Sequence, residues 1–189
     1  MLGDDHDTAV IMRGPKKHGL VQQFLSDVDW GFEPANRLNN VLIIDTPPGT
    51  SDEHLSVASI LQSCNLALPE DRRARVCAVM VSTPQEVALA DVRKELNFCQ
   101  KIQLPVLGLV ENMSGFVCPG CKHVTEIFSP GSGGCAKMCA EHNVRFLGKI
   151  PLDPALMKAG EQGCPWSQLA DDESPGLEMF MDVVAAILN

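Results

Sequence analysis

The stretch VLIIDTPPGT places a carboxylate at the end of an apolar run. Residues 41–44 are all apolar, Asp45 follows them directly, and Pro47, Pro48 and Gly49 then turn the chain. Ligands of open parallel sheets bind beyond the carboxyl ends of the strands. A carboxylate there can hold Mg²⁺ directly or through water, and glycine lets the backbone approach an anionic ligand. The alternative is that Asp45 only receives backbone hydrogen bonds in a strand-to-helix turn.

Two cysteines form a second group suited to chemistry. Cys118 and Cys121 make a Cys-x-x-Cys motif in a loop that contains glycine and proline. The loop follows the apolar run 106–110, which ends at Glu111 and Asn112, so it also lies beyond a predicted carboxyl end. Two thiolates at this spacing chelate one soft metal ion, but a structural zinc usually needs four ligands. Other ligands must therefore complete such a site.

Three interpretations of the cysteine pair fit the sequence. Cys135 and Cys139 can complete a four-cysteine zinc site within the chain, with His123 or His142 as substitutes. The same pair from a second subunit can instead share a cluster across a two-fold axis. A thioredoxin-like redox pair is disfavoured, because that motif opens a helix soon after a strand and residues 111–117 intervene here. Cys135 and Cys139 also lie four apart on a predicted helix, where they can simply pack as small hydrophobic side chains.

Apolar runs of strand length recur between segments of helical period. The predicted strands are residues 41–44, 76–82, 106–110 and 146–150, the last ended by Pro151, with a weaker one at 9–12. Continuous apolar runs of this length are typical of strands that are covered on both faces.

Helices are predicted between these strands and after them. An apolar stripe at three- and four-residue spacing predicts a helix over residues 20–28, and two closing helices are predicted at 155–161 and 175–188. Two capping boxes mark further helix starts: Thr50 with Glu53, and Thr83 with Glu86, the latter with Pro84 at the first helical position. The alternation predicts an α/β fold, with a mostly parallel, doubly wound sheet and helices on both faces.

Composition excludes some classes of function. The 189 residues are enough for one good core, so one domain is predicted. The formal net charge of −9 and the absence of tyrosine argue against a nucleic-acid surface. No apolar run approaches the roughly 20 residues that span a bilayer, so no membrane is expected. Eight cysteines without an apolar leader predict a reduced, cytoplasmic protein, where closely spaced cysteines more often bind metal than form disulfides.

Four motifs in order resemble one family. The segments DTPPGTSDEHLS, STPQEVALADVRKELNFCQK, GLVENMSGFVCPGC and GKIPLDPAL are similar to those of the Mrp-type iron-sulfur scaffold ATPases, above all the eukaryotic cytosolic nucleotide-binding proteins. The resemblance runs from about residue 9 to the carboxyl terminus and includes the RGPKK segment at 13–17. It implies a MinD-like P-loop NTPase fold.

The resemblance also implies roles in a nucleotide site. Asp45 and Gly49 would belong to the second switch, where Asp45 influences Mg²⁺ and the attacking water and Gly49 senses the γ-phosphate of ATP. Asn112 would read the adenine. Pro151 and Asp153 would line the other side of the base.

For the cysteines the resemblance implies a shared cluster. Cys118 and Cys121 would supply two of the four ligands of a labile [4Fe-4S] cluster that bridges two subunits. The partners would be a second copy or a paralogous scaffold ATPase, and recipient apo iron-sulfur proteins would receive the cluster. ATP hydrolysis would be linked to loading or release of the cluster.

Two family features are missing from the sequence. It contains no glycine-rich phosphate loop of GKGGVGKS type, since residues 131–137 lack the Gly-Lys-Ser/Thr ending, and it contains no amino-terminal cysteine motif for a second cluster. We therefore expect position 1 to follow the first strand, first helix and second strand of the parent fold. The chain is then one incomplete domain over 1–189 with a metal-binding loop at 113–130.

The missing phosphate loop has functional consequences. We expect the chain to bind ATP weakly, to be inactive as an ATPase, and to associate or be marginally stable, because an apolar sheet edge is exposed. Two alternatives to the scaffold remain. One is a mononuclear zinc-binding structural or adaptor domain, and the other is a truncated interaction module without catalysis.

Overall fold

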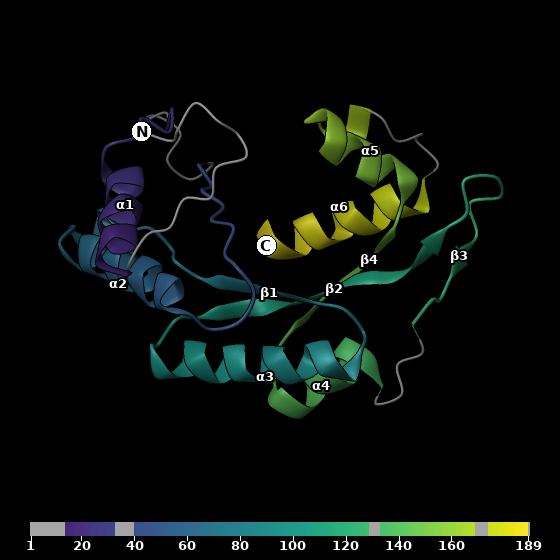
Figure 1. Ribbon diagram of the computed structural model, residues 1–189, viewed down its shortest axis with the longest axis horizontal. Helices are drawn as coiled ribbons and strands as arrows, with labels where there is room; N and C mark the ends of the chain where they lie inside the picture. Colours follow the sequence, from purple (N-terminus) through teal and green to yellow (C-terminus); the bar gives the residue numbers. More distant parts are fainter. Residues whose placement is uncertain (1–13, 33–39, 129–132, 169–173, 189) are drawn as a thin grey trace. The chain divides into compact units, whose positions relative to one another are not determined.

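The computed structural model describes residues 14–32, 40–128, 133–168 and 174–188 (Figure 1). The strand predicted at residues 9–12 and Arg13 of the RGPKK segment lie outside them. Contacts within the chain divide it into two compact units, Met1–Val76 and Cys77–Asn189. The single domain expected from the sequence stays a prediction.

The first unit is mainly a pair of helices. Helix α1 spans Gly14–Ser26 and contacts α2, which spans Asp52–Leu66 and leads to the short 3₁₀ helix η2, Glu70–Arg72. The helix predicted at 20–28 is thus confirmed, with an earlier start. An ion pair of 2.5 Å joins Lys17 of α1 to Glu53 in the first turn of α2.

The apolar run 41–44 is not a strand in the structure. Its backbone is irregular, and 60% of Val41 and 85% of Ile43 are exposed. The prediction of a strand covered on both faces is therefore wrong for this chain. A strand is stable only when its backbone groups pair with a neighbour, and no strand in the described ranges pairs with these residues. A run of apolar residues alone does not form a strand, because it also needs a neighbouring strand to pair with.

The second unit is a four-stranded, mostly parallel sheet (Figure 1). Strand β2, Val106–Val117, lies at its centre and pairs in parallel with β1, Ala78–Ser82, and with β4, Phe146–Leu152. The short strand β3, Val124–Thr125, pairs antiparallel with the outer end of β2. The α/β architecture expected from the sequence is confirmed.

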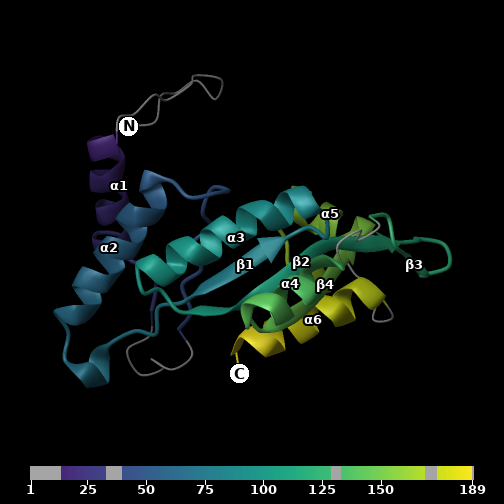
Figure 2. The same ribbon diagram turned by 90° about the horizontal axis from the view of Figure 1, so that it is seen from below.

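Helices cover both faces of this sheet (Figures 1 and 2). Helices α3, Glu86–Lys101, and α4, Gly134–His142, lie on one face, whereas α5, Pro154–Gln162, and α6, Pro175–Leu188, lie on the other. A 3₁₀ helix, η3, spans Trp166–Gln168 between the last two. The two closing helices predicted from the sequence are confirmed.

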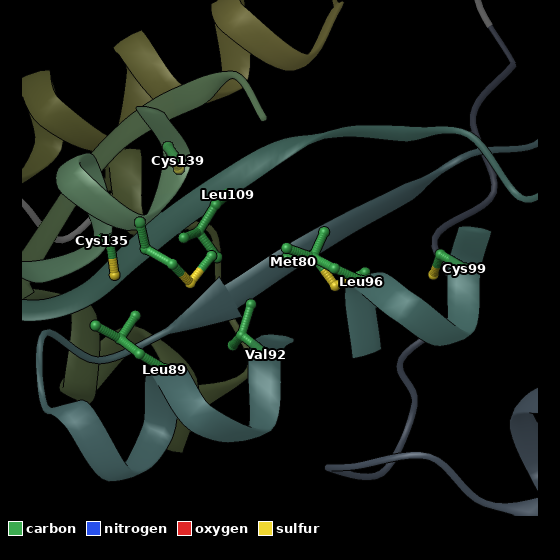
Figure 3. Close-up of a cluster of buried hydrophobic side chains, with 9 residues drawn as sticks. Met80, Leu89, Val92, Leu96, Cys99, Leu109, Cys135 and Cys139 are labelled. Atoms are coloured by element: carbon green, nitrogen blue, oxygen red, sulfur yellow. The ribbon is translucent and has the colours of Figure 1, made fainter. Parts of the chain in front are cut away.

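Alternating residues of β2 supply the two cores. Leu109 faces α3 and α4, and the next residue, Val110, packs with Leu147 of β4 and Val183 of α6 on the opposite face. The larger core is drawn in Figure 3. Its buried members are Met80, Leu89, Val92, Leu96, Cys99, Leu109, Cys135, Met138 and Cys139.

Several predicted boundaries are displaced. Strand β2 continues seven residues past Val110 because it forms a hairpin with β3. Strand β4 includes Pro151 instead of ending before it. Proline has no N–H to donate, and the β2–β4 register skips Pro151, so no ladder bond is lost there.

Neither predicted capping box forms at the residues expected. Helix α2 begins after Ser51, whose box partner is His54, one residue later than predicted. Helix α3 begins at Glu86 after an extended Gln85 that makes no side-chain cap, so the box of Thr83 with Glu86 is wrong. Neighbouring residues in the sequence can fit the same capping pattern. The local backbone geometry decides at which residue the helix begins.

Candidate functional site

The two cysteines of the motif lie at the tip of a hairpin. Beyond Glu111, where pairing with β1 ends, β2 pairs with β4 as far as Phe116 and forms a hairpin with β3 at its outer end (Figure 1). Cys118 is half-buried and Cys121 is exposed, both in the turn that joins the strands. The turn is closed by the Cys118 N–H, which donates to the His123 carbonyl at 3.0 Å, and by the Lys122 N–H, which donates to the Cys118 carbonyl at 2.8 Å.

The turn also stabilises a thiolate. The backbone N–H groups of Cys121 and Gly120, and then the Cys121 thiol, bond to the Cys118 sulfur and lower the pKa of the Cys118 thiol below its ordinary value. The thiolate is the form that binds metal. Cys118 and Cys121 are therefore suited to bind a soft metal ion or an iron-sulfur cluster. One chain supplies two such ligands.

Cys135 and Cys139 do not join this pair. Both are buried in the core against α3 and the sheet, with exposed fractions of 0% and 2% (Figure 3). Burial, followed by the charge of Glu111, raises the pKa of the Cys135 thiol to about 12, and the same two causes raise the pKa of Cys139. These thiols are structural side chains of the core.

The intrachain zinc site is therefore not formed in the described part of the chain. Within it, no three or more side chains of histidine, cysteine, aspartate or glutamate are grouped to hold a metal ion, so neither Cys135 and Cys139 nor His123 and His142 complete the site. This zinc interpretation required four ligands in one chain, and it is wrong for these residues.

Asn112 lies at the base of the hairpin arm. Its Oδ1 accepts the N–H of Met113 at 2.9 Å, which supports the left-handed backbone of Met113, with φ of 54°. A bulge in the pairing of β2 with β4 follows at this point. Asn112 thus stands where the parallel sheet changes into the arm, and its role toward adenine stays a prediction.

Pro151 and Asp153 lie at the end of β4. Pro151 is fully buried, and Asp153 is the N-cap of α5. The two carboxylate oxygens of Asp153 accept the Ala155 N–H and the Ser174 hydroxyl, each at 2.8 Å. The structure assigns Asp153 a capping role, and a contact of either residue with a base stays a prediction.

Asp45 and Gly49 belong to the first unit. Asp45 is exposed, and Gly49 has a φ of +83°, a left-handed conformation that favours glycine. Asn112 and the two motif cysteines belong to the second unit. The roles of Asp45 and Gly49 toward Mg²⁺ and phosphate stay predictions.

His54 also shapes this turn, although neither predicted capping box included it. Its Nδ1 accepts the Ser51 N–H at 3.1 Å, so the ring proton is on Nε2, which donates to the Pro47 carbonyl at 3.0 Å. The imidazole thus ties the turn that contains Gly49 to the start of α2. The signal was present in the sequence, because His54 stands three residues after a serine that can cap a helix.

Sequence comparison identifies the family. A family model described as ParA, NUBPL iron-transfer P-loop NTPase, matches residues 1–188. The chain belongs to this family. It is 48% identical over 183 residues to a protein of Drosophila pseudoobscura pseudoobscura named cytosolic Fe-S cluster assembly factor Nubp1 homolog. The aligned region covers 97% of this chain and 55% of that protein. The chain therefore spans about half the length of this relative.

Solved structures agree with the fold. The chain is 33% identical to a nucleotide-binding protein of Archaeoglobus fulgidus in complex with ADP, with a TM-score of 0.60, covering 86% of this chain and 59% of that one. The septum site-determining protein MinD of Pyrococcus horikoshii, in complex with Mg-ADP, is 17% identical, with a TM-score of 0.54. The match covers 94% of this chain and 60% of that one. The second likeness concerns the fold alone, and together they confirm the MinD-like P-loop NTPase fold.

No helix in the described ranges is both long and apolar enough to cross a membrane.

Proposed function

We propose that the chain is a scaffold in cytosolic iron-sulfur cluster assembly. Two subunits hold one labile [4Fe-4S] cluster between them, and each supplies Cys118 and Cys121. The cluster is the cargo, which passes to apo iron-sulfur proteins. The second subunit is another copy of this chain or a paralogous scaffold ATPase.

One observation carries this proposal above the others. The turn from Cys118 to Lys122 presents one half-buried and one exposed sulfur at the tip of a hairpin, with backbone N–H groups directed at the Cys118 sulfur. Two thiolates leave half of the ligand positions of a cubane cluster open. A symmetric second subunit supplies the other two without any further residue of this chain.

The family relationship supports this choice of cargo. The matching family is described as iron-transfer, and the Drosophila relative is named a cluster assembly factor. The relative is named cytosolic, and we place this chain in the cytoplasm as part of the same proposal.

We further propose that nucleotide chemistry accompanies cluster transfer. We place Asp45 and Gly49 at the Mg²⁺ and γ-phosphate of ATP, and Asn112, Pro151 and Asp153 at its base. Glycine at position 49 lets the backbone approach phosphate, and a carboxylate at position 45 suits Mg²⁺ or its bound water. The phosphate loop itself is not among these 189 residues.

Anaerobic reconstitution with ferrous iron and sulfide tests the proposal. The native chain is expected to bind roughly two irons per chain, to turn brown, and to pass its cluster to an apo-ferredoxin. The double variant Cys118→Ser, Cys121→Ser is expected to lose all three properties.

The matched control is Cys64→Ser, since Cys64 is an exposed cysteine in α2. This variant is expected to behave as the native chain does. Equal iron binding by the native chain and the double variant would contradict the proposal, and so would one zinc bound by a monomer.

A further inference from the structure

Glu111 is a buried carboxylate that the proposed function does not use. Only 4% of it is exposed, and it is the last residue of β2 that pairs with β1. Burial of an ionised carboxylate is costly unless other groups pair with it and hydrogen-bond to it. Its position therefore depends on its partners.

Two partners from different elements hold this carboxylate. Oε2 accepts the backbone N–H of Cys135 at 3.1 Å, and Oε1 lies 3.5 Å from Nζ of Lys149, its neighbour in register on β4. Cys135 is in the first turn of α4, which follows a left-handed Gly133. The start of a helix has unpaired N–H groups and the positive end of the helix dipole, and both favour a carboxylate.

Glu111 also stands at the base of the hairpin that bears the cysteines. We call residues 112–128 the cysteine arm: the outer part of β2, the turn with Cys118 and Cys121, β3, and the residues that follow it. The arm begins directly after Glu111, where β1 ends, and its pairing with β4 becomes irregular between Asn112 and Phe116. Helix α4 follows the arm in the sequence. Glu111 accepts the N–H of Cys135 in the first turn of this helix.

We infer that Glu111 is a positioning residue for the cysteine arm. Its carboxylate ties the start of the arm on β2 to the first turn of α4, and Lys149 ties the same carboxylate to β4. The contact restrains the base of the arm, and with it the two sulfurs at the tip. As far as it concerns retention of the cluster, this inference rests on the proposed function.

Two substitutions separate the contributions of the side chain. Glu111→Leu removes the acceptor and leaves the Cys135 N–H without it. Glu111→Gln keeps an acceptor oxygen but removes the charge, which weakens the hydrogen bond. Glu141→Leu is the control, because Glu141 lies on the same helix α4 and, within the described ranges, its carboxylate forms an exposed ion pair with Lys137 at 3.9 Å.

The first readout is hydrogen exchange of the chain without metal. Amides of residues 117–125 are expected to exchange about tenfold faster in Glu111→Leu than in the native chain, with Glu111→Gln in between. Those of α3 are expected to keep their rates. Equal acceleration over the whole second unit would show a merely structural role, and unchanged exchange in the arm would overturn the inference as well.

The second readout is the rate at which an iron chelator removes the reconstituted cluster. This rate is expected to rise about tenfold in Glu111→Leu and less in Glu111→Gln, while Glu141→Leu matches the native chain. Equal rates in all four proteins would overturn the inference and leave the scaffold proposal intact. A native chain that takes up no cluster would refute the scaffold proposal, and exchange in the arm would still decide the positioning role. If Glu111→Leu does not fold, Glu111→Gln alone is compared with the native chain.

Discussion

The thiols of Cys118 and Cys135 differ in pKa because their surroundings differ. Backbone N–H groups of the turn stabilise the charged form of Cys118, whereas burial beside Glu111 destabilises the charged form of Cys135. A lowered pKa means that thiolate is present above that pKa and is lost as the pH falls through it. A raised pKa means that Cys135 stays a thiol at neutral pH.

We predict that iodoacetamide alkylates Cys118 quickly at neutral pH in the chain without metal. The rate is expected to fall as the pH drops below the lowered pKa, because the thiolate is the reacting form. Cys135 is expected to stay unmodified until the chain unfolds. Mass spectrometry of peptides gives both rates, with exposed Cys64 as a comparison within the same chain. Alkylation of Cys135 ahead of Cys118 would contradict the assignment of one cysteine to the site and the other to the core.

His54 is the residue through which the first unit holds its proline-rich turn. His54→Ala removes the bonds to the Ser51 N–H and the Pro47 carbonyl. We predict that the start of α2 loses about 1 kcal/mol of local stability, the usual effect of losing a helix cap. Hydrogen exchange of the first α2 amides measures this, and His18→Ala, an exposed histidine of α1, is the control. Equal exchange in the two variants would exclude a capping role for His54.

At the scale of elements, α6 packs on β4 through a glycine. Gly148 has a φ of 145°, and an added Cβ would lie 2.7 Å from Cγ2 of Val183. We predict that Gly148→Ala destabilises the second unit by about 1–3 kcal/mol, through overpacking and backbone strain. Urea denaturation measures the change.

Gly160 in α5 provides the matched control for this substitution. An added Cβ there meets nothing within 4 Å, so Gly160→Ala is expected to be neutral or to stabilise by about 0.5–1 kcal/mol. A Gly148→Ala variant as stable as Gly160→Ala would show that the contact of α6 with β4 adapts without cost.

The elements that were predicted well from the sequence depend on local pattern. Helix α6 begins at Pro175 as expected, because proline suits the first helical position and an apolar stripe follows. The strand predicted at residues 41–44 does not form, because a strand needs a pairing partner that can be distant in sequence. The outer half of β2 was missed because Glu111 and Asn112 look like the end of a strand, whereas a hairpin partner at residues 124–125 extends it.

The candidate site was predictable to a similar degree. The motif at Cys118 and Cys121 was visible from spacing alone, and so was the helix that carries Cys135 and Cys139. Which face of that helix points into the core depends on packing against α3, which spacing does not show. The pairing of Glu111 with the first turn of α4 joins residues 24 positions apart, and no local pattern predicts it.

For the molecule as a whole, the sequence contains the cysteine arm and the residues that we propose for a nucleotide site, but it contains no glycine-rich phosphate loop. In P-loop NTPases the backbone N–H groups and the lysine of that loop hold the phosphates. We predict that these 189 residues bind Mg-ATP more weakly than micromolar affinity and do not hydrolyse it. Isothermal titration and a phosphate-release assay measure both. A micromolar dissociation constant would show that other residues of the chain hold the phosphates.

In the proposed scaffold, two chains share one cluster through Cys118 and Cys121. Native mass spectrometry of the anaerobically reconstituted chain can detect this assembly, because the mass reports subunits, iron and sulfide together. We predict a species of two chains with one Fe₄S₄ unit, which is absent from the Cys118→Ser, Cys121→Ser variant and present in Cys64→Ser. A single chain that retains its own metal, or a dimer whose cluster survives loss of both cysteines, would contradict it.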